Sequence, residues 1–390
     1  MKIAFIGQKG IPVSSGGVER RVQELATRMA KLGHDVFVYA RKNYSSQMPT
    51  QYQGVKIIYL PCIETKNLGA ITHTLLASFH AIFQKYDVVH YQAPGPSSLC
   101  WIMKLLSPST GLVATFNSRD EKHQKWGPIA RAYLRFGEFI INKVPDRTIA
   151  VSKLIKEHSR EKYGNRNITV IHNGSAITPT LETDKLEKWD LKKNQYFLTV
   201  ARLVRHKGIH YLIEAFKNAK QKHAFPKNFK LAIVGDSAYT DDYVTYLKEI
   251  ANADQDIVFT GSQQGSALAQ LYTNAFAFVL PSEAEGLSNV LLEAMGYGLA
   301  PIISSIPENT VVVKENGLTF ENKNIADLEK MLILAVNTPE NIQKLGLLAK
   351  QSVREKYNWD ENVTRTLKLY TNLLQEKTNR QFIFQRKRLS

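Results

Sequence analysis

The sequence predicts an α/β protein of two tandem doubly wound, Rossmann-like domains that face a central cleft. Three observations support this fold class. Short runs rich in β-branched and aromatic residues alternate with helical patterns, which is typical of parallel sheets covered by helices. These runs are almost continuously apolar, as expected of strands buried on both faces. The alternation stops at a polar stretch and then restarts, and 390 residues leave room for two or three domains of about 150 residues.

The first domain is expected over residues 1–178, with a helix at 16–33 directly after its first strand. In this helix Val22, Leu25, Ala26, Met29 and Leu32 share one face, and Gly33 acts as a stop signal. Two further helices are expected at 70–85 and 127–143. The predicted strands are KIAFIG (2–7), DVFVYAR (35–41), VKIIYLP (55–61), DVVHYQ (87–92), LVATFN (112–117) and DRTIAVS (146–152).

Residues 179–195 are polar and charged and are expected to link the first domain to a second domain at 196–358. The predicted strands of the second domain are 196–202, 230–235, 257–261, 277–282 and 301–305, and its predicted helices are 208–220, 241–252, 265–274 and 289–298. A last segment, 359–390, opens with an amphipathic helix, ends in a basic tail and is expected to cross back to the first domain. Ligands of doubly wound sheets bind at the carboxyl ends of the strands, so the cleft between the domains is the expected site.

The composition is that of an ordinary globular protein with a large positive charge. Lys and Arg number 51 against 35 Asp and Glu, which gives a net charge of +16. Such an excess attracts nucleic acid, anionic lipid or phosphorylated small molecules, or it belongs to a well-solvated surface. The sequence shows no recognised nucleic-acid-binding module, so no nucleic acid partner is expected.

Neither a membrane span nor a disulfide framework is expected. No stretch approaches the roughly 18 uncharged apolar residues of a spanning helix, and the N-terminal apolar run is too short for a signal peptide. The two cysteines, Cys62 and Cys100, do not form a C-x-x-C pair. These features predict a cytoplasmic protein.

The loop after the first strand, GQKGIPVSSGGVER (7–20), leads through Gly16 and Gly17 directly into a helix. A helix start offers free backbone N–H groups and a partial positive charge, so a glycine-lined approach suits a phosphate. The spacing is neither G-x-G-x-x-G nor that of a P-loop. A turn that merely needs positive φ values is the alternative interpretation.

In the second domain the loop ARLVRHKG (201–208) again follows a first strand, and it gathers Arg202, Arg205 and Lys207. A diphosphate leaving group needs either a metal ion or fixed cations to absorb its developing charge. The sequence has no D-x-D motif and no metal-ligand spacing of His or Cys. Fixed cations without a metal are therefore expected, and a solvated basic loop is the alternative.

The stretch PSEAEGLSNVLLEAM (281–295) places two acids around the start of a helix. Glu285 lies in the loop after a strand and Glu293 lies on the helix that begins near Asn289. Carboxylates accept hydrogen bonds from sugar hydroxyls, and paired acids also serve glycosidases. Because these two acids adjoin an anion-binding helix end and a cationic loop, a nucleotide sugar suits the pattern better than a plain glycoside.

The first domain adds TFNSRDEKHQKWG (115–127) at the end of its fifth strand. Asn117, Arg119, Asp120 and His123 are expected near the same edge of the cleft. A lone Asp or His in a loop is often structural. The sequence contains no G-x-S-x-G elbow, so a hydrolase triad is not supported.

Several motifs together resemble a known enzyme family. They are SSGGVE (14–19), ARLVRHKG (201–208), LAIVGD (231–236), FTGS (259–262) and PSEAEGLSNVLLEAMGYGLAPIIS (281–304). Over essentially its whole length the chain resembles the retaining glycosyltransferases of GT-B architecture in glycosyltransferase family 4, which include sucrose-phosphate synthases and many bacterial cell-surface sugar transferases. The motifs GQKGIP, LGAITHTLLASFHAIFQKYDVVHYQAPGPS and HQKWGPIARAYLRFGE resemble a bacterial subgroup whose members are often rhamnosyltransferases of polysaccharide assembly.

This resemblance assigns parts of a nucleoside diphosphate sugar to individual residues. It implies that Glu285 binds the transferred sugar, that Glu293 binds the ribose, and that Arg202 and Lys207 hold the diphosphate. The donor-binding residues it implies are Gly16, Gly17, Arg202, Lys207, Gly235, Gly261, Ser262, Glu285, Gly286, Leu287, Ser288, Asn289 and Glu293. The catalytic residues expected with them are Arg202, Lys207, Glu285, Asn117 and Asp120. No cofactor and no metal are expected, since the nucleotide sugar is a substrate.

One position departs from the family pattern. The family usually has a histidine after the strand that ends near Thr115, where this chain has Asn117. That histidine is thought to contact the transferred sugar. Asparagine can hydrogen-bond a hydroxyl but cannot carry charge. Three interpretations stay open: the chemistry tolerates Asn, the donor differs, or catalysis has been lost.

The resemblance leads to an expected reaction. A hexose or 6-deoxyhexose, such as rhamnose, would move from a nucleoside diphosphate to a lipid-linked or growing surface-polysaccharide acceptor with retention. The departing phosphate would take the acceptor proton, and the protein would contribute positioning and electrostatic stabilisation. A non-catalytic sugar-nucleotide-binding subunit is the alternative, and an epimerase of the same architecture is a second one.

The predicted helix at 127–143 also suggests a membrane contact. It places Arg131 and Arg135 one turn apart, beside Ile129, Ala132, Tyr133 and Phe136, and Lys122 and Lys125 precede it. A basic and aromatic face of this kind is expected on an anionic membrane, where a lipid-linked acceptor would be presented. A helix packed on the sheet with solvated arginines is the alternative. The tail 380–390 would assist membrane contact or form a disordered end.

Overall fold

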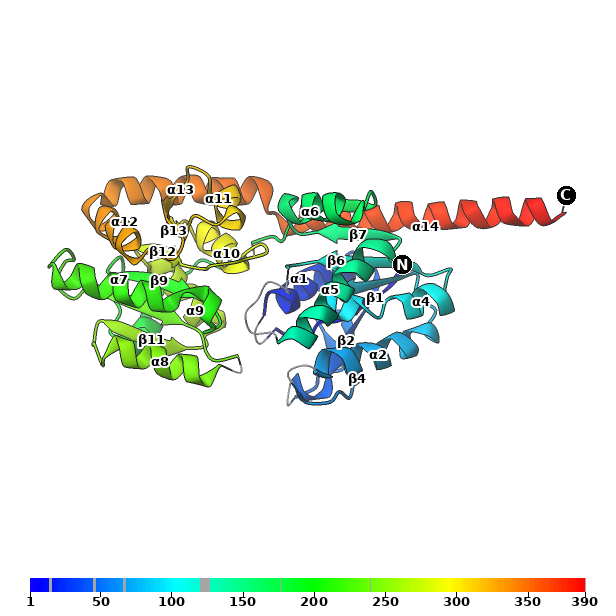
Figure 1. Cartoon of the computed structure of the whole chain (residues 1–390), viewed down its shortest axis with the longest axis horizontal. Coiled ribbons are helices and arrows are strands. Elements are labelled where there is room, and N and C mark those ends of the chain that lie inside the picture. Colours follow the sequence, from blue (N-terminus) through cyan, green and yellow to red (C-terminus); the bar gives the residue numbers. More distant parts are fainter. Residues whose placement is uncertain are drawn as a thin grey trace. The chain divides into compact units, whose positions relative to one another are not determined.

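The computed structural model describes residues 1–13, 16–44, 47–65, 68–119, 127–175, 177–238 and 240–389, the last nine of these by their backbone. The chain divides into two compact units (Figure 1). Unit 1 comprises Met1–Asn173 and Trp359–Ser390, and unit 2 comprises Gly174–Asn358. Each unit is built on its own mainly parallel sheet.

The sheet of unit 1 has the strand order β3-β4-β2-β1-β5-β6-β7-β8. The pair β3 and β4 is antiparallel, and the other pairings are parallel. The strands are β1 (Lys2–Ile6), β2 (Asp35–Arg41), β3 (Gln51–Tyr52), β4 (Val55–Leu60), β5 (Val88–Gln92), β6 (Gly111–Phe116), β7 (Arg147–Ala150) and β8 (Ile168–Val170). The strand order reverses between β1 and β5, so the loops after these two strands flank a topological switch point.

Helices cover both faces of this sheet, as the buried runs of its strands require. They are α1 (Gly17–Lys31), α2 (Leu68–Ile82), α3 (Pro94–Ser97), α4 (Trp101–Leu106), α5 (Pro128–Lys143), α6 (Lys153–Tyr163) and α14 (Trp359–Leu389), with a 3-10 turn η1 (Lys42–Tyr44). α14 packs against α1 and β6, and its Tyr370 hydroxyl lies 2.6 Å from Nδ1 of the buried His90. The C-terminal segment is therefore part of unit 1.

The sheet of unit 2 has the order β11-β10-β9-β12-β13-β14, and all its pairings are parallel. The strands are β9 (Tyr196–Val200), β10 (Lys230–Val234), β11 (Ile257–Gly261), β12 (Ala277–Leu280), β13 (Pro301–Ser304) and β14 (Leu318–Phe320). Here the order reverses between β9 and β12. The loops that follow these two strands therefore leave the sheet side by side, at the place where doubly wound proteins bind ligands.

The helices of unit 2 are α7 (Ile209–Gln221), α8 (Asp241–Ala251), α9 (Gly265–Asn274), α10 (Asn289–Tyr297), α11 (Pro307–Val313), α12 (Ile325–Asn337) and α13 (Pro339–Lys356), with 3-10 turns η3 (Asp184–Trp189) and η4 (Arg205–Lys207). Phe197 on β9 lies at the centre of the core, where its ring meets those of Phe225, Phe229 and Phe276 edge-on. Such edge-to-face contacts add to the stability that apolar burial already supplies. The core thus fixes β9, from which one of the switch-point loops departs.

The units differ in detail from the predicted domains. The boundary falls between Asn173 and Gly174, a few residues before the expected end at 178. Residues 179–195, expected as a linker, lie within unit 2 and contain η3, whose Leu186 is buried. The backbone N–H of Asn194 donates to the carbonyl of Asn274 at 2.8 Å, so this polar stretch is fastened to α9.

Candidate functional site

The candidate site of unit 2 is formed by the loops that follow β9 and β12. These strands are paired, with Ala277 opposite Phe197 and Phe278 opposite Leu198. The basic loop 201–208 and the acidic loop 281–288 are therefore neighbours at the switch point. The backbone N–H of Glu283 donates to the carbonyl of His206 at 2.8 Å, which joins the two loops directly.

An ion pair closes this junction. The ammonium of Lys207 donates to Oε1 of Glu285 at 2.5 Å, and the two side chains are only 13% and 9% exposed. A largely desolvated pair of this kind interacts more strongly than a surface ion pair, because water screens it less. The two residues that sequence analysis assigned to the diphosphate and to the sugar are thus brought together.

Glycine is required where the loops touch most closely. Gly208, with φ of 68°, lies so near the carbonyl of Pro281 that a Cβ atom there would stand 2.0 Å from its oxygen. Gly235, with φ of 144°, would bring a Cβ to 1.8 Å from the carbonyl oxygen of Ala201, next to Arg202. The N–H of Gly235 also donates to the carbonyl of Gly261 at 3.0 Å. Gly235 and Gly261 therefore share one edge of the sheet with Arg202.

The helix after the acidic loop offers its N-terminus to the same edge. α10 begins at Asn289, and its N-cap residue Ser288 makes no side-chain capping hydrogen bond. The Ser288 hydroxyl is buried without a hydrogen-bond partner among the described residues, and Leu287 is buried beside it. A helix start of this kind carries a partial positive charge that favours an anion. Gly286 is partly exposed where the loop turns into this helix.

Glu293 lies one turn further along α10 and is held among aromatic rings. It is buried, and the hydroxyl of Tyr272 lies 3.4 Å from its Oε2. The ring of Tyr272 stacks on that of Tyr297 with centroids 5.0 Å apart and planes 8° from parallel. The stacked pair keeps the Tyr272 hydroxyl, and with it the Glu293 carboxylate, in one orientation.

The remaining predicted residues of the basic loop and its neighbour differ in exposure. Arg202 is exposed directly after β9, and Ser262 is exposed directly after β11. Arg205 lies over the ring of Tyr246 on α8, with its guanidinium 5.9 Å from the ring centre. Arg205 is thus engaged with α8, while Lys207 of the same loop is engaged with Glu285.

Glu283 is a site residue that sequence analysis did not single out. Its carboxylate accepts from the Tyr211 hydroxyl at 3.0 Å and lies 3.0 Å from the Lys323 ammonium. Burial and this carboxylate raise the pKa of Tyr211 to about 12, so the phenol keeps its proton and donates. Glu283 ties the acidic loop to α7 and to the segment after β14. No local motif signals this role, because both partners are distant in sequence.

Four predicted site residues belong to unit 1, namely Gly16, Gly17, Asn117 and Asp120. Gly16, with φ of 104°, is the N-cap of α1, and Gly17 is the first residue of that helix. A Cβ on Gly16 would stand 2.1 Å from Glu19 Oε2, whose partner oxygen Oε1 accepts from the backbone N–H of Lys9 at 3.0 Å. The positive φ favours glycine here, since the Glu19 side chain could move but the backbone conformation would remain strained for another residue.

Asn117 follows β6 and is partly exposed, and its Nδ2 has no hydrogen-bond partner among the described residues. The predicted catalytic residue Asp120 lies outside the described residues, and so do Lys122, His123 and Lys125. The structure therefore tests neither the placement of Asp120 nor that of the basic residues near it.

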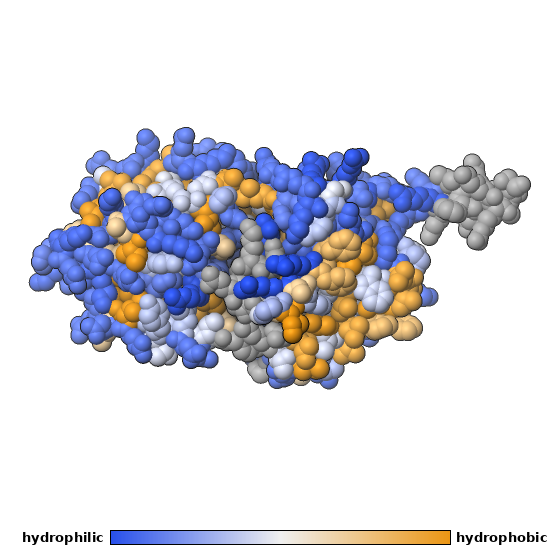
Figure 2. Space-filling model, viewed as in Figure 1, coloured by the Kyte–Doolittle hydropathy of each residue, from blue (hydrophilic) through white to orange (hydrophobic). Residues whose placement is uncertain are grey.

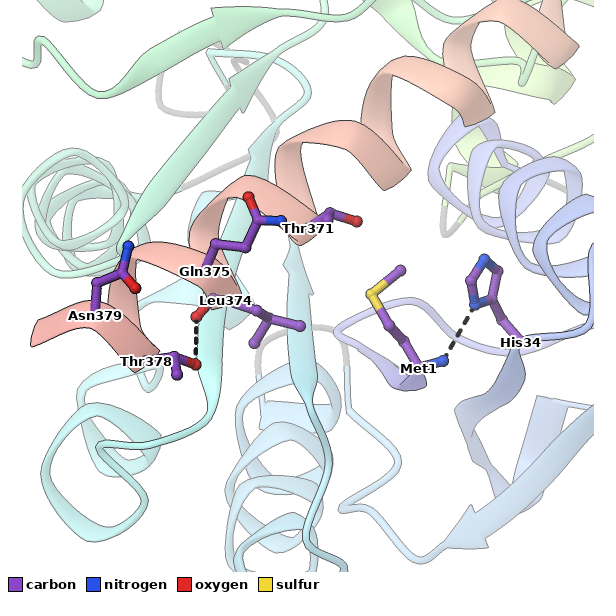
Figure 3. A pocket seen from close by; sticks show the side chains of 7 residues that line it. All are labelled: Met1, His34, Thr371, Leu374, Gln375, Thr378 and Asn379. Atoms are coloured by element: carbon purple, nitrogen blue, oxygen red, sulfur yellow. Dashed lines mark hydrogen bonds between the residues drawn. The ribbon is translucent and has the colours of Figure 1, made fainter. Parts of the chain in front are cut away.

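Unit 1 also has a hollow of about 700 Å³, lined by Met1, His34, Thr371, Leu374, Gln375, Thr378 and Asn379 (Figure 3). The N-terminal amino group lies 3.3 Å from Nδ1 of His34. Burial, together with that amino group, lowers the pKa of His34. Because Met1 and His34 precede β1 and β2, this hollow lies at the amino ends of the strands and is separate from the loops considered above.

Within the described part of the chain, no group of three or more His, Cys, Asp or Glu residues is placed to hold a metal ion. Over the same residues, no helix combines the length and apolarity that crossing a bilayer requires.

Two family models match the sequence in succession. Glycosyltransferase Family 4 matches residues 15–176, and Glycosyl transferases group 1 matches residues 182–352. The chain carries the two domains of a GT-B glycosyltransferase. The first match includes Gly16, Gly17 and Asn117, and the second includes the ion pair of Lys207 and Glu285. The predicted family is confirmed at this level.

Relatives extend over almost the whole chain. An uncharacterized glycosyltransferase of Methanocaldococcus jannaschii is 26% identical over 95% of this chain and 98% of its own length. The O-antigen chain mannosyltransferase C of Escherichia coli is 21% identical over 97% of this chain and 100% of its own length. The name of the first relative gives no sugar and that of the second gives mannose, so these relatives do not name the sugar that this chain transfers.

Solved structures share the fold. Sucrose-phosphate synthase from Thermosynechococcus elongatus superposes with a TM-score of 0.79 at 21% identity, covering 96% of this chain and 99% of that one. HepE of Anabaena in complex with UDP and glucose superposes with a TM-score of 0.80 at 18% identity, covering 95% and 100%. The predicted fold of two Rossmann-like α/β domains is confirmed.

Proposed function

We propose that this protein is a retaining glycosyltransferase that moves a hexose or 6-deoxyhexose from a nucleoside diphosphate to a lipid-linked or growing surface-polysaccharide acceptor. The observation that carries the proposal is the buried pair of Lys207 and Glu285 beside the start of α10. It places a cation, a carboxylate and a helix N-terminus at one switch point, which suits a molecule that combines phosphate with sugar. Rhamnose is the sugar that we favour, on the motifs of the first half of the chain.

The donor would be held along the edge of the unit 2 sheet. Lys207, Arg202 and the start of α10 would bind the diphosphate, and Glu285 would accept hydrogen bonds from the sugar hydroxyls. Glu293, held by Tyr272, would bind the ribose. Main-chain groups from Gly286 to Asn289 would surround the sugar, and those of Gly235, Gly261 and Ser262 would lie beside the base. The UDP in the HepE complex supports a nucleotide donor.

In the proposed reaction the bond between the anomeric carbon and the β-phosphate oxygen breaks, and a bond from that carbon to the acceptor oxygen forms on the same face. The acceptor proton passes to the departing phosphate. Lys207, Arg202 and the start of α10 stabilise the charge that develops on the diphosphate, without a metal ion. The loss of its Glu285 partner to a sugar hydroxyl would leave Lys207 available to the phosphate.

Unit 1 would bind the acceptor. Gly16 and Gly17 at the start of α1 would approach the diphosphate, and Asn117 would hydrogen-bond the transferred sugar through its amide. We keep Asp120 as a proposed catalytic residue of the same loop. The enzyme would work in the cytoplasm, on the inner face of the plasma membrane.

The test is to incubate the purified protein with a panel of nucleoside diphosphate sugars, with and without a membrane-lipid extract and a chelator, and to follow nucleotide release. We expect release from one donor that depends on the extract and is insensitive to the chelator. The anomeric configuration of the product, read by NMR, checks retention. Release that depends on a divalent metal, or a product of inverted configuration, would overturn the corresponding part of the proposal.

One observation favours a second candidate, a non-catalytic sugar-nucleotide-binding subunit. Asn117, whose amide nitrogen has no partner among the described residues, cannot supply a charge to a transition state. Calorimetric binding of a nucleotide sugar without turnover under any acceptor condition would support this candidate over the enzyme.

A further inference from the structure

α2 of unit 1 buries small and polar side chains and exposes large apolar ones, which is the reverse of an ordinary surface helix. Its buried side consists of small or polar residues, such as Thr74, Ala77 and Ser78, and the Ser78 hydroxyl lies 2.6 Å from that of the buried Tyr91. Most of its large apolar residues are exposed, Leu76 and Phe79 among them, while Ile71 and Ile82 are partly buried. A surface helix of a globular protein normally turns its apolar stripe toward the core. The outward stripe of α2 therefore requires another explanation than the packing of unit 1.

The exposed stripe continues onto neighbouring elements. Phe83, just after α2, is 79% exposed, and on α4, which packs beside α2, Trp101 and Leu105 are exposed. We call Leu75, Leu76, Phe79, Phe83, Trp101 and Leu105 the α2/α4 face. Figure 2 shows apolar side chains gathered over α2, α4 and α5. Contiguous exposed apolar surface of this kind, as opposed to scattered single residues, marks an interaction site.

α5 extends the same surface and corrects the sequence-based expectation for this helix. Ile129, Phe136 and Phe139 form its outward apolar stripe. Tyr133, expected on the membrane-facing side, instead points toward α3, where its hydroxyl donates to the carbonyl of Gly95 at 3.2 Å. The outward face of α5 is thus aliphatic and phenylalanine-rich, with the exposed Arg135 on it.

The charge of these helices is one-sided. α2 contains no Asp, Glu, Lys or Arg, and the one charged residue of α4 is Lys104. α5 contributes Arg131, Arg135 and Lys143, and its single acid, Glu138, is 1% exposed and lies 2.6 Å from His158 Nε2. Because Lys104 is ion-paired with Asp146 and Glu138 is buried, the exposed charge on the three helices comes from the cations of α5 and is positive.

We propose that the α2/α4 face, continued by the outward stripe of α5, docks on the surface of an anionic lipid bilayer. Apolar and aromatic side chains flanked by cations are the combination that binds at the boundary of headgroups and acyl chains. A second copy of the chain fits less well, because it would bring two positive surfaces together without acids to pair them. This inference rests on the proposed function only in that the acceptor is lipid-linked. The bilayer bound by this face would then present the acceptor to unit 1.

The experiment is flotation of the full-length protein with vesicles of phosphatidylcholine alone or with about a third phosphatidylglycerol, in the absence of any donor. Wild type is expected to float with the anionic vesicles and much less with the neutral ones. The double variant Phe83→Ser, Leu105→Ser should bind about tenfold more weakly or worse, since two apolar side chains no longer enter the bilayer. Arg135→Gln should weaken binding by a smaller factor that salt also reproduces.

The matched control is Leu32→Ser with Leu347→Ser, two residues that are 61% and 63% exposed but lie outside the α2/α4 face. This control should bind like wild type. All variants should keep the wild-type melting temperature and nucleotide affinity, because the substituted side chains are exposed and far in sequence from the site loops. If a variant loses binding and also has a lower melting temperature, the flotation measurement is repeated with Trp101→Phe, which removes only the indole.

Two outcomes would overturn the proposal. The first is flotation of the Phe83→Ser, Leu105→Ser variant to the same extent as wild type. The second is that wild type forms a dimer, that this variant is a monomer, and that neither protein binds vesicles. The fluorescence of Trp101, obtained as the difference between wild type and Trp101→Phe, should also shift to the blue on adding anionic vesicles. Since none of these readouts uses a sugar donor, failure here would leave the proposed transferase activity standing, and loss of that activity would leave vesicle binding testable.

Discussion

The two units share a doubly wound fold and use its surface in opposite ways. In unit 2 the loops at the switch point are fixed by the pair of Lys207 and Glu285. They also pack closely at Gly208 and Gly235, where an added Cβ would overlap a carbonyl oxygen. Its exposed large apolar residues are few among the described ones: Leu181 before η3, Val311 on α11, Leu334 on α12, and Leu347 and Leu348 on α13. Unit 1 instead gathers apolar side chains on α2, α4 and α5. This difference agrees with the proposed division of labour, in which the rigid, charged loops of unit 2 would bind a small polar donor and the apolar surface of unit 1 would face a membrane.

The sharpest test of the fixed loops in unit 2 is Lys207→Ala. Removing one electrostatic contact to a transition state lowers turnover by about 10²–10³, and we expect a fall in kcat of this size. Turnover is measured with the donor that the panel of nucleoside diphosphate sugars selects. The control is Lys222→Ala, which breaks a pair with Glu329 on another surface of the same unit. Near-normal turnover of the Lys207 variant would remove this residue from the proposed mechanism.

Gly235→Ala tests the close packing of the same loops. The new Cβ would overlap the carbonyl oxygen of Ala201 and would need a positive φ, so the free energy of unfolding should fall by about 2–4 kcal/mol. Urea titration of this variant, and of the control Gly265→Ala, measures the free energy of unfolding. Gly265→Ala shares a positive φ but has no atom within 4 Å of the added Cβ, and it should lose only about 1 kcal/mol. Equal losses would mean that backbone conformation, and not the close approach, requires glycine at position 235.

Each unit contains a buried histidine that should make its free energy of unfolding depend on pH. Burial lowers the pKa of His73 in unit 1 and of His210 in unit 2 to about 4, from about 6.5 in the unfolded chain. Above pH 6.5 both states are neutral and the effect vanishes. Below it the unfolded chain binds the proton first, so stability falls between pH 6.5 and 4.

Between pH 7 and 5 each of these histidines should lower the free energy of unfolding by roughly 1–2 kcal/mol. Urea titrations of His73→Gln and His210→Gln at the two pH values, compared with wild type, separate the contributions. A pH dependence that both substitutions leave unchanged would show that neither histidine is buried in its neutral form.

The smallest expected effect is that of Glu283→Gln. The amide still accepts from Tyr211 but loses its charge opposite Lys323, so kcat should fall several-fold while KM changes little, in line with at most about 1 kcal/mol for an ion pair with a half-exposed lysine. Glu283→Ala should cost more, because both partners are lost. A change in KM alone would mean that Glu283 touches the donor and does not act through the loop.

Local patterns predicted most of the fold. Most strands of both sheets and the helices α1, α5 and α10 follow from apolar runs and from glycine or proline at their ends. Sequence analysis did not predict the strands β3, β8 and β14, the helices α3, α4, α6, α11, α12 and α13, or η3 within the expected linker. The three strands, α3 and η3 are short, and the linker segment is held by partners distant in sequence, as in the bond between Asn194 and Asn274. A one-dimensional pattern carries little signal for them.

The candidate site divides in the same way. Lys207, Glu285 and Glu293 could be named from residue types beside a helix start, and the family motifs agree. Glu283 could not, because its partners Tyr211 and Lys323 come from other elements. Asp120 stays a prediction.

By itself the sequence determined the two doubly wound domains, the family and the charged loops at the ends of the strands, because periodicity and turn chemistry are local properties of the chain. Only the tertiary structure decided that Lys207 meets Glu285, that Glu283 joins three segments, and that α2 turns its leucines and phenylalanines outward. The reason is that the sequence pattern of an apolar helix is the same whether its apolar stripe faces the core or the solvent. Which side is buried depends on the elements that pack against it, and these come from distant parts of the chain.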